Sequence, residues 1–281
     1  MSSRRAFCFS AVGLLNALVW PTGYAVSHNH AYGPDPRQGL DIYTPASFPG
    51  DAAAPVVFFI YGGSWEDGDK AMYRFVGAAL ATRGFVVVIA DYRIWPQVRF
   101  PVFLQDGALA LRWTVDNIAR FGGDPGSIRL LGHSAGAYNA AMLAFDPRWL
   151  APVGLAAHTL LRGFAGLAGP YDFLPLTSPT LQAIFGPPDQ LAQTQPINFL
   201  SASVPPIWLA AGADDKTVDP GNTRRLAARA ALDGATVSGR IYSGLDHRLP
   251  LGVFAAPLRP LAPVLHDVVA FLRAPEGRTS V

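Results

Sequence analysis

Short, continuous apolar runs alternate with helical patterns along this chain from about residue 40 onward. Six apolar runs are candidate strands: residues 56–61, 85–90, 128–131, 163–168, 207–211 and 235–241. Helical stretches lie between or after them, at about 70–82, 102–119, 135–145, 221–232 and 257–272. A strand that is apolar throughout is buried on both faces, so the alternation predicts an α/β fold with a mostly parallel central sheet and helices on both faces. Such a sheet binds ligands at the carboxyl ends of its strands.

The length and composition suit a single domain of this kind. The chain has 281 residues, of which 50% are hydrophobic and 15% are charged, which is enough apolar material for a large core. We expect one domain over residues 26–281. Residues 170–206 depart from the alternation because they are rich in proline and have few long helical runs. A stretch this long is usually a functional loop or a lid, and a surface excursion without a role is the alternative.

Residues 1–25 have the layout of a secretory signal peptide. Arg4 and Arg5 precede an apolar stretch over residues 6–20, and small residues end at Ala25. This order is typical of export signals, and the surroundings of the two arginines resemble the twin-arginine motif. We expect cleavage after Ala25 and a periplasmic or secreted protein; a membrane anchor formed by an uncleaved N-terminal segment is the alternative. No apolar run reaches the ~20 residues of a membrane span.

The charge balance argues against a nucleic-acid partner. The chain has 22 basic and 20 acidic residues, and the two totals become equal once Arg4 and Arg5 are removed. A nucleic-acid-binding role therefore lacks its usual electrostatic support. Cys8 is the one cysteine, which excludes a disulfide framework and a cysteine-based metal site. Nothing in the sequence implies a metal or an organic cofactor, and the oligomeric state stays open.

A G-x-S-x-G pattern over residues 132–136 provides the candidate nucleophile, Ser134. It follows the expected strand 128–131 and precedes the expected helix 135–145, which is the context that this motif requires. Glycines two residues before and two after the serine leave room for a tight strand-to-helix turn. The turn lifts the hydroxyl above the sheet at a helix N-terminus, where negative charge is favoured.

Backbone N–H groups near Ser134 are candidates for an oxyanion hole. Acyl transfer needs preorganised donors for the carbonyl oxygen that becomes negative. Gly62 and Gly63 follow the first expected strand, and the absence of side chains lets their backbone approach a substrate closely. Ala135, directly after the nucleophile, supplies the third candidate N–H.

The candidate general base is His247, which lies in a loop between the last expected strand and the last helix. The other five histidines fit surface or structural positions better; they are His28, His30, His133, His158 and His266. An acid is expected between the serine and the histidine in chain order. Asp214 and Asp215 follow the strand 207–211, and either carboxylate could orient the imidazole of His247 and stabilise its cation.

Together these residues resemble the α/β-hydrolase superfamily. Within it they are similar to small esterases related to hormone-sensitive lipase, to feruloyl esterases of the BD-FAE type and to isoprenylcysteine methylesterases. The resemblance runs from about residue 32 to residue 272 and includes Leu40-Asp41-Ile42-Tyr43-Thr44-Pro45, Asp91-Tyr92-Arg93 and Gly122-Gly123-Asp124-Pro125.

The family pattern selects one acid and shows one departure. In the family the acid stands three residues after a glycine and three before a valine, which here are Gly212 and Val218, so the resemblance implies Asp215. The oxyanion loop of the family usually reads His-Gly-Gly, whereas Tyr61 stands here in place of the histidine. That side chain is usually structural in the family, so Gly62 and Gly63 are still expected to donate.

The resemblance implies a serine carboxylesterase that cleaves small to medium carboxylic esters through an acyl-enzyme. An amidase, formamidase or peptidase with the same triad is one alternative, and a catalytically silent binding protein with this fold is another.

Four aromatic residues are candidates for an apolar substrate pocket, with a place in the core as the alternative: Trp65, Tyr92, Trp95 and Phe173.

Overall fold

The computed structural model describes residues 15–18, 22–48 and 52–274. Most of the expected signal peptide, at residues 1–14 and 19–21, lies outside the described residues. Residues Leu15–Leu18 form a short 3-10 helix, η1, and Tyr24 and Ala25 already belong to the first strand. The expected cleavage position after Ala25 therefore falls inside this strand.

Eight strands form one sheet in the order β1-β2-β4-β3-β5-β6-β7-β8. Their bounds are β1 Tyr24–Ala31, β2 Gly39–Pro45, β3 Ala54–Ile60, β4 Val86–Ala90, β5 Gly123–His133, β6 Leu161–Leu167, β7 Ile207–Gly212 and β8 Val237–Tyr242. Strand β2 runs antiparallel to β1 and β4, and all the other pairs are parallel. The mostly parallel sheet is as expected. Strands β3, β4, β6 and β7 are almost wholly buried, and β5 is buried from Ile128 onward.

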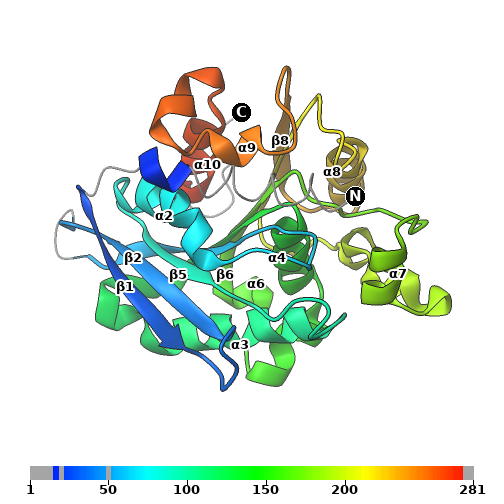
Figure 1. The fold of residues 1–281 in the computed structure, drawn as a ribbon, viewed down its shortest axis with the longest axis horizontal. Coiled ribbons are helices and arrows are strands. Elements are labelled where there is room, and N and C mark those ends of the chain that lie inside the picture. Colours follow the sequence, from blue (N-terminus) through cyan, green and yellow to red (C-terminus); the bar gives the residue numbers. More distant parts are fainter. Residues whose placement is uncertain (1–14, 19–21, 49–51, 275–281) are drawn as a thin grey trace.

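Helices cover both faces of the sheet. The main ones are α2 Arg74–Ala81, α3 Val102–Asn117, α4 Ala135–Phe145, α8 Gly221–Leu232 and α10 Val264–Arg273. Figure 1 shows α2 and α10 on one side of the sheet and α3 and α4 on the other. The short helices are α5 Pro147–Leu150, α6 Ala157–Leu160, α7 Pro179–Phe185 and α9 Leu249–Gly252. None of the helices in the described ranges is long and apolar enough to cross a membrane.

Two expected helices are each divided in the structure. The stretch expected at 70–82 consists of a 3-10 turn, η2 Lys70–Tyr73, followed by α2. The stretch expected at 257–272 consists of η7 Ala256–Leu261 followed by α10. Pro260 and Pro263 explain the second division, because proline has no N–H to continue the α-helical ladder.

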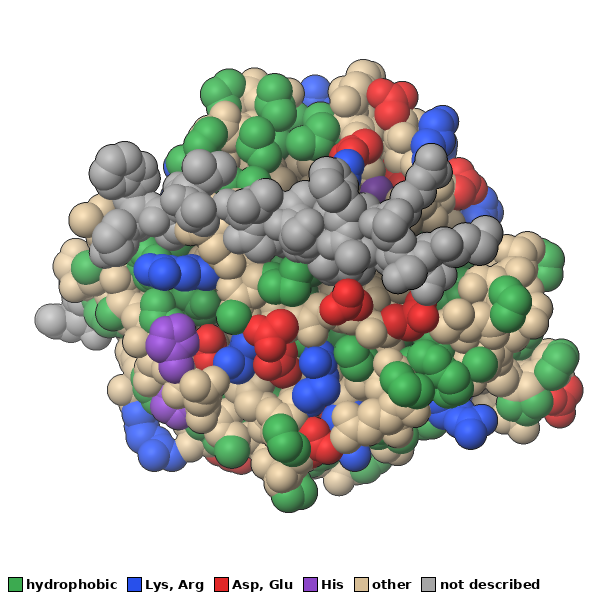
Figure 2. Space-filling view, viewed as in Figure 1, with side chains coloured by type: hydrophobic (Ala, Val, Ile, Leu, Met, Phe, Trp, Pro, Cys, Tyr) green, Lys and Arg blue, Asp and Glu red, His purple; other side chains and the backbone are tan. Residues whose placement is uncertain are grey.

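The excursion at residues 170–206 contains α7 and two 3-10 helices, η5 Pro188–Thr194 and η6 Pro196–Phe199. In Figure 1 α7 lies at the edge of the molecule beyond α4. In Figure 2 basic and acidic side chains are interspersed over the visible face, as the near balance of charges predicts.

Candidate active site

Ser134 lies at a sharp turn between β5 and α4. Its backbone has φ 56° and ψ −127°, a conformation in which a residue with a side chain is strained. The two glycines of the motif are required for space. A Cβ on Gly132 would lie 2.5 Å from Cα of Ala137, and one on Gly136 would lie 2.1 Å from the carbonyl oxygen of Ile60. The end of β3 is thus packed directly against the first turn of α4.

His247 connects Ser134 to Asp215. The Nε2 atom of His247 lies 2.9 Å from Oγ of Ser134, and its Nδ1 lies 2.7 Å from Oδ2 of Asp215. Hydrogen bonding to a carboxylate through Nδ1 leaves Nε2 free to accept the serine proton. The side chain of Asp215 is fully buried and that of His247 is 13% exposed, so the pair is largely shielded from water.

Asp215 is held by its own turn after β7. Its Oδ1 accepts hydrogen bonds from the N–H groups of Thr217 at 2.8 Å and Val218 at 2.9 Å. Burial alone would raise the pKa of Asp215, but the hydrogen bond and charge of His247, together with these two N–H groups, hold that pKa below its usual range. The neighbouring Asp214 is exposed, and its backbone N–H donates to the carbonyl oxygen of Leu245.

A hydrogen bond from His133 holds the loop that carries His247. The Nε2–H of His133 donates to the carbonyl oxygen of His247 at 3.0 Å, and the two rings lie 5.1 Å apart. Burial, followed by the effect of His247, lowers the pKa of His133 to about 3. His133 is therefore neutral over the ordinary pH range and acts here as a hydrogen-bond donor. Sequence reasoning assigned it no specific contact.

The loop after β3 passes directly over the nucleophile. A Cβ on Gly62 would lie 2.7 Å from Cβ of Ser134, and one on Gly63, where φ is +138°, would lie 2.0 Å from the carbonyl oxygen of Asp67. Only glycine fits at both positions. The N–H groups of Gly62, Gly63 and Ala135 find no hydrogen-bond acceptor within the described ranges, so they are available to a ligand beside Ser134.

Trp65, a residue of this loop, belongs to a buried aromatic cluster. Its ring centroid lies 5.1 Å from that of Tyr138, 4.8 Å from that of Phe185 and 6.3 Å from that of Phe173. Its Nε1–H donates to Oδ1 of Asn139 at 2.9 Å. The bond ties the loop to α4, the helix that Ser134 precedes. The structure thus brings Trp65 and Phe173 together in one aromatic cluster, in which Trp65 is 3% exposed.

Three members of this region, Tyr138, Asn139 and Phe185, were missed by sequence reasoning. Asn139 stands alone as an amide in the otherwise apolar and aromatic helix α4. A buried polar side chain on such a helix requires a partner, and that signal could have indicated a tertiary contact.

The other two aromatic candidates lie elsewhere. Tyr92 is 2% exposed, and its hydroxyl donates to the carbonyl oxygen of Tyr61 at 2.8 Å. Trp95 is partly buried, and its backbone N–H donates to the carbonyl oxygen of Trp65. Tyr92 therefore packs beneath the loop in the core, and its hydroxyl is already engaged by the protein.

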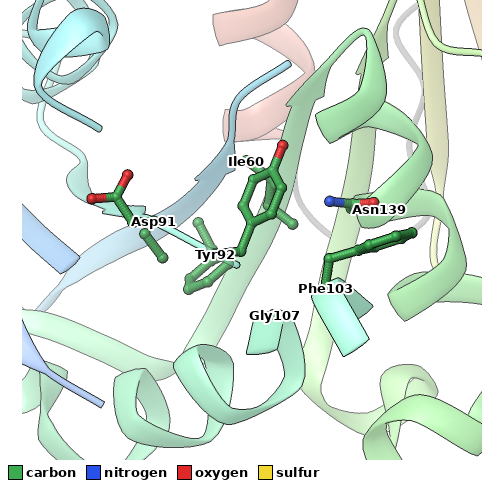
Figure 3. A pocket seen from close by; sticks show the side chains of 8 residues that line it. Ile60, Asp91, Tyr92, Phe103, Gly107 and Asn139 are labelled. Atoms are coloured by element: carbon green, nitrogen blue, oxygen red, sulfur yellow. The ribbon is translucent and has the colours of Figure 1, made fainter. Parts of the chain in front are cut away.

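A small cavity of about 10 Å³, enough for one water molecule, lies beside Tyr92 between β3, β4, α3 and α4. Figure 3 shows Phe103 and Asn139 facing Ile60 and Tyr92 across it, while the carboxylate of Asp91 points away. Neither Ser134 nor His247 lines this cavity. Within the described ranges no group of three or more His, Cys, Asp or Glu is placed to hold a metal ion.

Comparison with known proteins links the sequence to esterases. The BD-FAE family model matches residues 40–149. An isoprenylcysteine alpha-carbonyl methylesterase of Arabidopsis thaliana is 28% identical over 242 residues, which is 79% of this chain and 56% of that protein. Esterase LipC of Mycobacterium tuberculosis is 29% identical over 70% of this chain and 53% of its own length. The chain thus spans about half the length of the curated relatives that it matches.

Solved structures share the fold along nearly the whole chain. Esterase B of Lactobacillus rhamnosis superimposes with a TM-score of 0.79 at 21% identity, covering 95% of this chain and 94% of that one. A truncated carbohydrate esterase from gut microbiota superimposes with a TM-score of 0.78 at 21% identity, covering 90% and 97%. These likenesses show that the eight-stranded sheet and its helices form the α/β-hydrolase fold.

Proposed function

We propose that this chain is a serine carboxylesterase of the α/β-hydrolase superfamily, related to the BD-FAE and hormone-sensitive-lipase-like esterases that it resembles. The observation that carries the proposal is the position of His247, within hydrogen-bond distance of both Ser134 Oγ and Asp215 Oδ2. A serine hydrogen-bonded to a histidine, which is in turn hydrogen-bonded to a buried carboxylate, provides the groups needed for acyl transfer.

In the proposed reaction His247 Nε2 accepts the proton of Ser134 as Oγ attacks the ester carbonyl. The negative charge that develops on the carbonyl oxygen is stabilised by the N–H groups of Gly62, Gly63 and Ala135. When the tetrahedral intermediate collapses, the leaving alcohol takes the proton from His247. Water then attacks the acyl-enzyme and gives up a proton to His247. His247 returns this proton to Ser134 Oγ as the acid product leaves, which restores the hydroxyl.

Small to medium esters are the proposed substrates. Amides are the competing class, because an amidase would use the same groups. Turnover of matched pairs separates the two, for example a p-nitrophenyl ester and the corresponding p-nitroanilide. We expect the ester to be cleaved faster, because an alcohol leaves more easily than an amine.

The test uses a fluorophosphonate probe together with p-nitrophenyl acetate, butyrate and octanoate. We expect covalent labelling of the wild-type protein at Ser134 and turnover of the shorter esters. Ser134→Ala should abolish labelling and lower turnover by several orders of magnitude, leaving only what binding and the oxyanion donors supply. A folded wild-type protein that neither labels nor turns over any ester or amide would instead support a silent binding protein.

A further inference from the structure

We propose that Tyr61 is a positioning residue whose buried hydroxyl, held between Asp91 and Arg37, sets the oxyanion donors Gly62 and Gly63 over Ser134. The inference rests on the proposed esterase function and deepens it. It assigns a role to the one position at which the oxyanion loop departs from the family pattern.

The first observation is that the loop closes around the Tyr61 ring. Tyr61 is fully buried, and a Cβ on Gly68 would lie 2.7 Å from its Cε2 atom. The same hypothetical Cβ would lie 2.9 Å from the carbonyl oxygen of Gly62. The two ends of the loop, at Gly62 and Gly68, are therefore in close contact with each other and with this ring. A shift of the ring would move both ends.

The second observation is the hydrogen bonding of the hydroxyl. It donates to Oδ1 of Asp91 at 2.6 Å and accepts from Nη2 of Arg37 at 3.1 Å. The same Nη2 donates to the carbonyl of Gly68 at 2.8 Å, and Nε of Arg37 donates to the carbonyl of Tyr92 at 2.9 Å. One hydroxyl thus links the loop to the segment after β4 and to the connection between β1 and β2.

The carboxylate of Asp91 is held in place by hydrogen bonds from the loop region. Its Oδ1 also accepts a hydrogen bond from the backbone N–H of Lys70 at 2.7 Å, and Figure 3 shows its carboxylate turned away from the cavity beside Tyr92. The direct neighbours of Tyr61 restrain the ring from both faces, since Tyr73 and Tyr92 stack on it at centroid distances of 5.1 and 5.0 Å. Tyr92 also holds the Tyr61 carbonyl, directly before Gly62.

These contacts matter for rate because donor position matters. Oxyanion stabilisation depends on N–H groups that are already aimed at the developing charge, and the loss of one such donor typically lowers kcat by about 10²–10³-fold. Loosening a loop that carries two donors should cost less than deleting one. Substrate binding in the ground state should change little, because the charge is absent there.

The decisive variant is Tyr61→Phe, which keeps the ring and removes the hydroxyl. We expect kcat to fall roughly 10- to 100-fold, with KM within about threefold of wild type. The affinity for a trifluoromethyl ketone, which binds serine hydrolases as an oxyanionic hemiketal, should weaken by a factor similar to the fall in kcat. Tyr43→Phe is the matched control, because it removes the hydroxyl of a buried tyrosine that lies in strand β2 and should leave kcat and ketone affinity unchanged.

The outcomes separate the two proposals. If wild type is inactive and unlabelled, the esterase function fails and this inference fails with it. If wild type is active and Tyr61→Phe matches it in kcat and ketone affinity, the function stands and the inference is overturned. If Tyr61→Phe does not fold, Arg37→Met replaces it as the test, because Arg37 is only partly buried. It should lower kcat and ketone affinity together, and unchanged values would overturn the inference.

Discussion

Asp215 and Asp214 are adjacent carboxylates with opposite environments. The side chain of Asp215 is fully buried and bonded to His247, whereas Asp214 is exposed. We predict that Asp215→Asn lowers kcat by about 10³–10⁴-fold, because the amide cannot hold the imidazole in the tautomer that accepts the serine proton. Asp214→Asn is the matched control and should stay within about threefold of wild type. Initial rates on p-nitrophenyl acetate give both values; equal effects of the two substitutions would contradict the assignment.

His133 makes the stability of the protein depend on pH. Its folded-state pKa is about 3, whereas a histidine in an unfolded chain has a pKa of about 6.5. Between these values the unfolded chain binds a proton that the folded protein does not. The contribution of His133 is therefore fully present above about pH 6.5 and is lost as pH falls, at up to about 1.4 kcal/mol per pH unit.

The measurement is urea unfolding at several pH values between 4 and 8. His133→Gln removes the titrating ring and keeps an amide that can donate to the His247 carbonyl, so its stability should fall less steeply below about pH 6.5. His158→Gln is the control for removing a histidine at the surface. Identical slopes for His133→Gln and wild type would show that the buried ring does not contribute.

The sequence predicts site residues that follow a strand end, but it does not predict those that act through contacts with distant segments. Ser134, His247 and Asp215 each follow a strand of the mostly parallel sheet, so chain order and residue type nominate Ser134 and His247 and limit the acid to Asp214 or Asp215. The family pattern then selects Asp215. The structure then brings the three within hydrogen-bond distance. Asn139 and Arg37 act through contacts with segments 74 and 24 residues away in the chain. No local pattern specifies such partners.

At the scale of elements, the close contact between β3 and α4 is set by Gly136. A Cβ there would lie 2.1 Å from the Ile60 carbonyl and 2.4 Å from that of Tyr61. We predict that Gly136→Ala destabilises the protein by about 1–3 kcal/mol, because backbone atoms must separate. Activity should fall as well, since the displaced carbonyls adjoin Gly62.

Gly252→Ala is the matched control for this prediction. A Cβ at Gly252, in α9, meets only side-chain carbons at 3.7 and 3.8 Å, which is ordinary contact. Its stability should equal or slightly exceed that of wild type, because alanine restricts the unfolded chain. Thermal unfolding compares the two variants; a stable, fully active Gly136→Ala would refute the close packing inferred here.

The lid-like excursion reaches the aromatic cluster through α7. Phe185, at the end of this helix, is 3% exposed and lies edge-to-face with Trp65. Removing a buried phenylalanine of this kind typically lowers stability by about 3–5 kcal/mol. We predict that Phe185→Ala also raises the octanoate-to-acetate rate ratio, because it opens space beside Trp65.

The same rate ratio is measured for Leu174→Ala as a control. Leu174 belongs to the same excursion but is 38% exposed, so its truncation should leave both stability and the ratio near wild type. A destabilised Phe185→Ala with an unchanged ratio would assign α7 to the core and leave the excursion without a role in substrate choice.

Element boundaries were predictable where the chain is forced to turn. Helix α4 begins directly after the strained Ser134 and ends before Asp146 and Pro147, which start the next helix. Strand β1 was missed for the opposite reason. It is an edge strand whose residues are mostly exposed or partly buried and include Ser27, His28, Asn29 and His30, so it carries no apolar signal. Its place in the sheet depends on pairing with β2.

At the scale of the whole molecule, the predicted signal-peptide cleavage position lies inside the first strand of the sheet. Residues 1–25 carry the predicted signal, yet Tyr24 and Ala25 pair with Pro45 and Thr44 of β2. The Tyr24 ring also stacks on Tyr43 at 6.2 Å. Cleavage after Ala25 would remove these contacts and leave β1 to begin at Val26. Because β1 is an edge strand, the sheet should tolerate this loss better than it would in a central strand.

We predict that the chain, expressed in a Gram-negative host with a twin-arginine pathway, yields a periplasmic form whose first residue is Val26. Replacing Arg4 and Arg5 together by lysine should retain the protein in the cytoplasm if the twin-arginine route is used. The control replaces Arg224 and Arg229, on the exposed face of α8, by lysine and should leave export unchanged. Cell fractionation followed by N-terminal mass spectrometry measures both properties. A cytoplasmic protein that keeps residues 1–25 would contradict the signal, whereas a membrane fraction with an intact N-terminus would favour the uncleaved anchor.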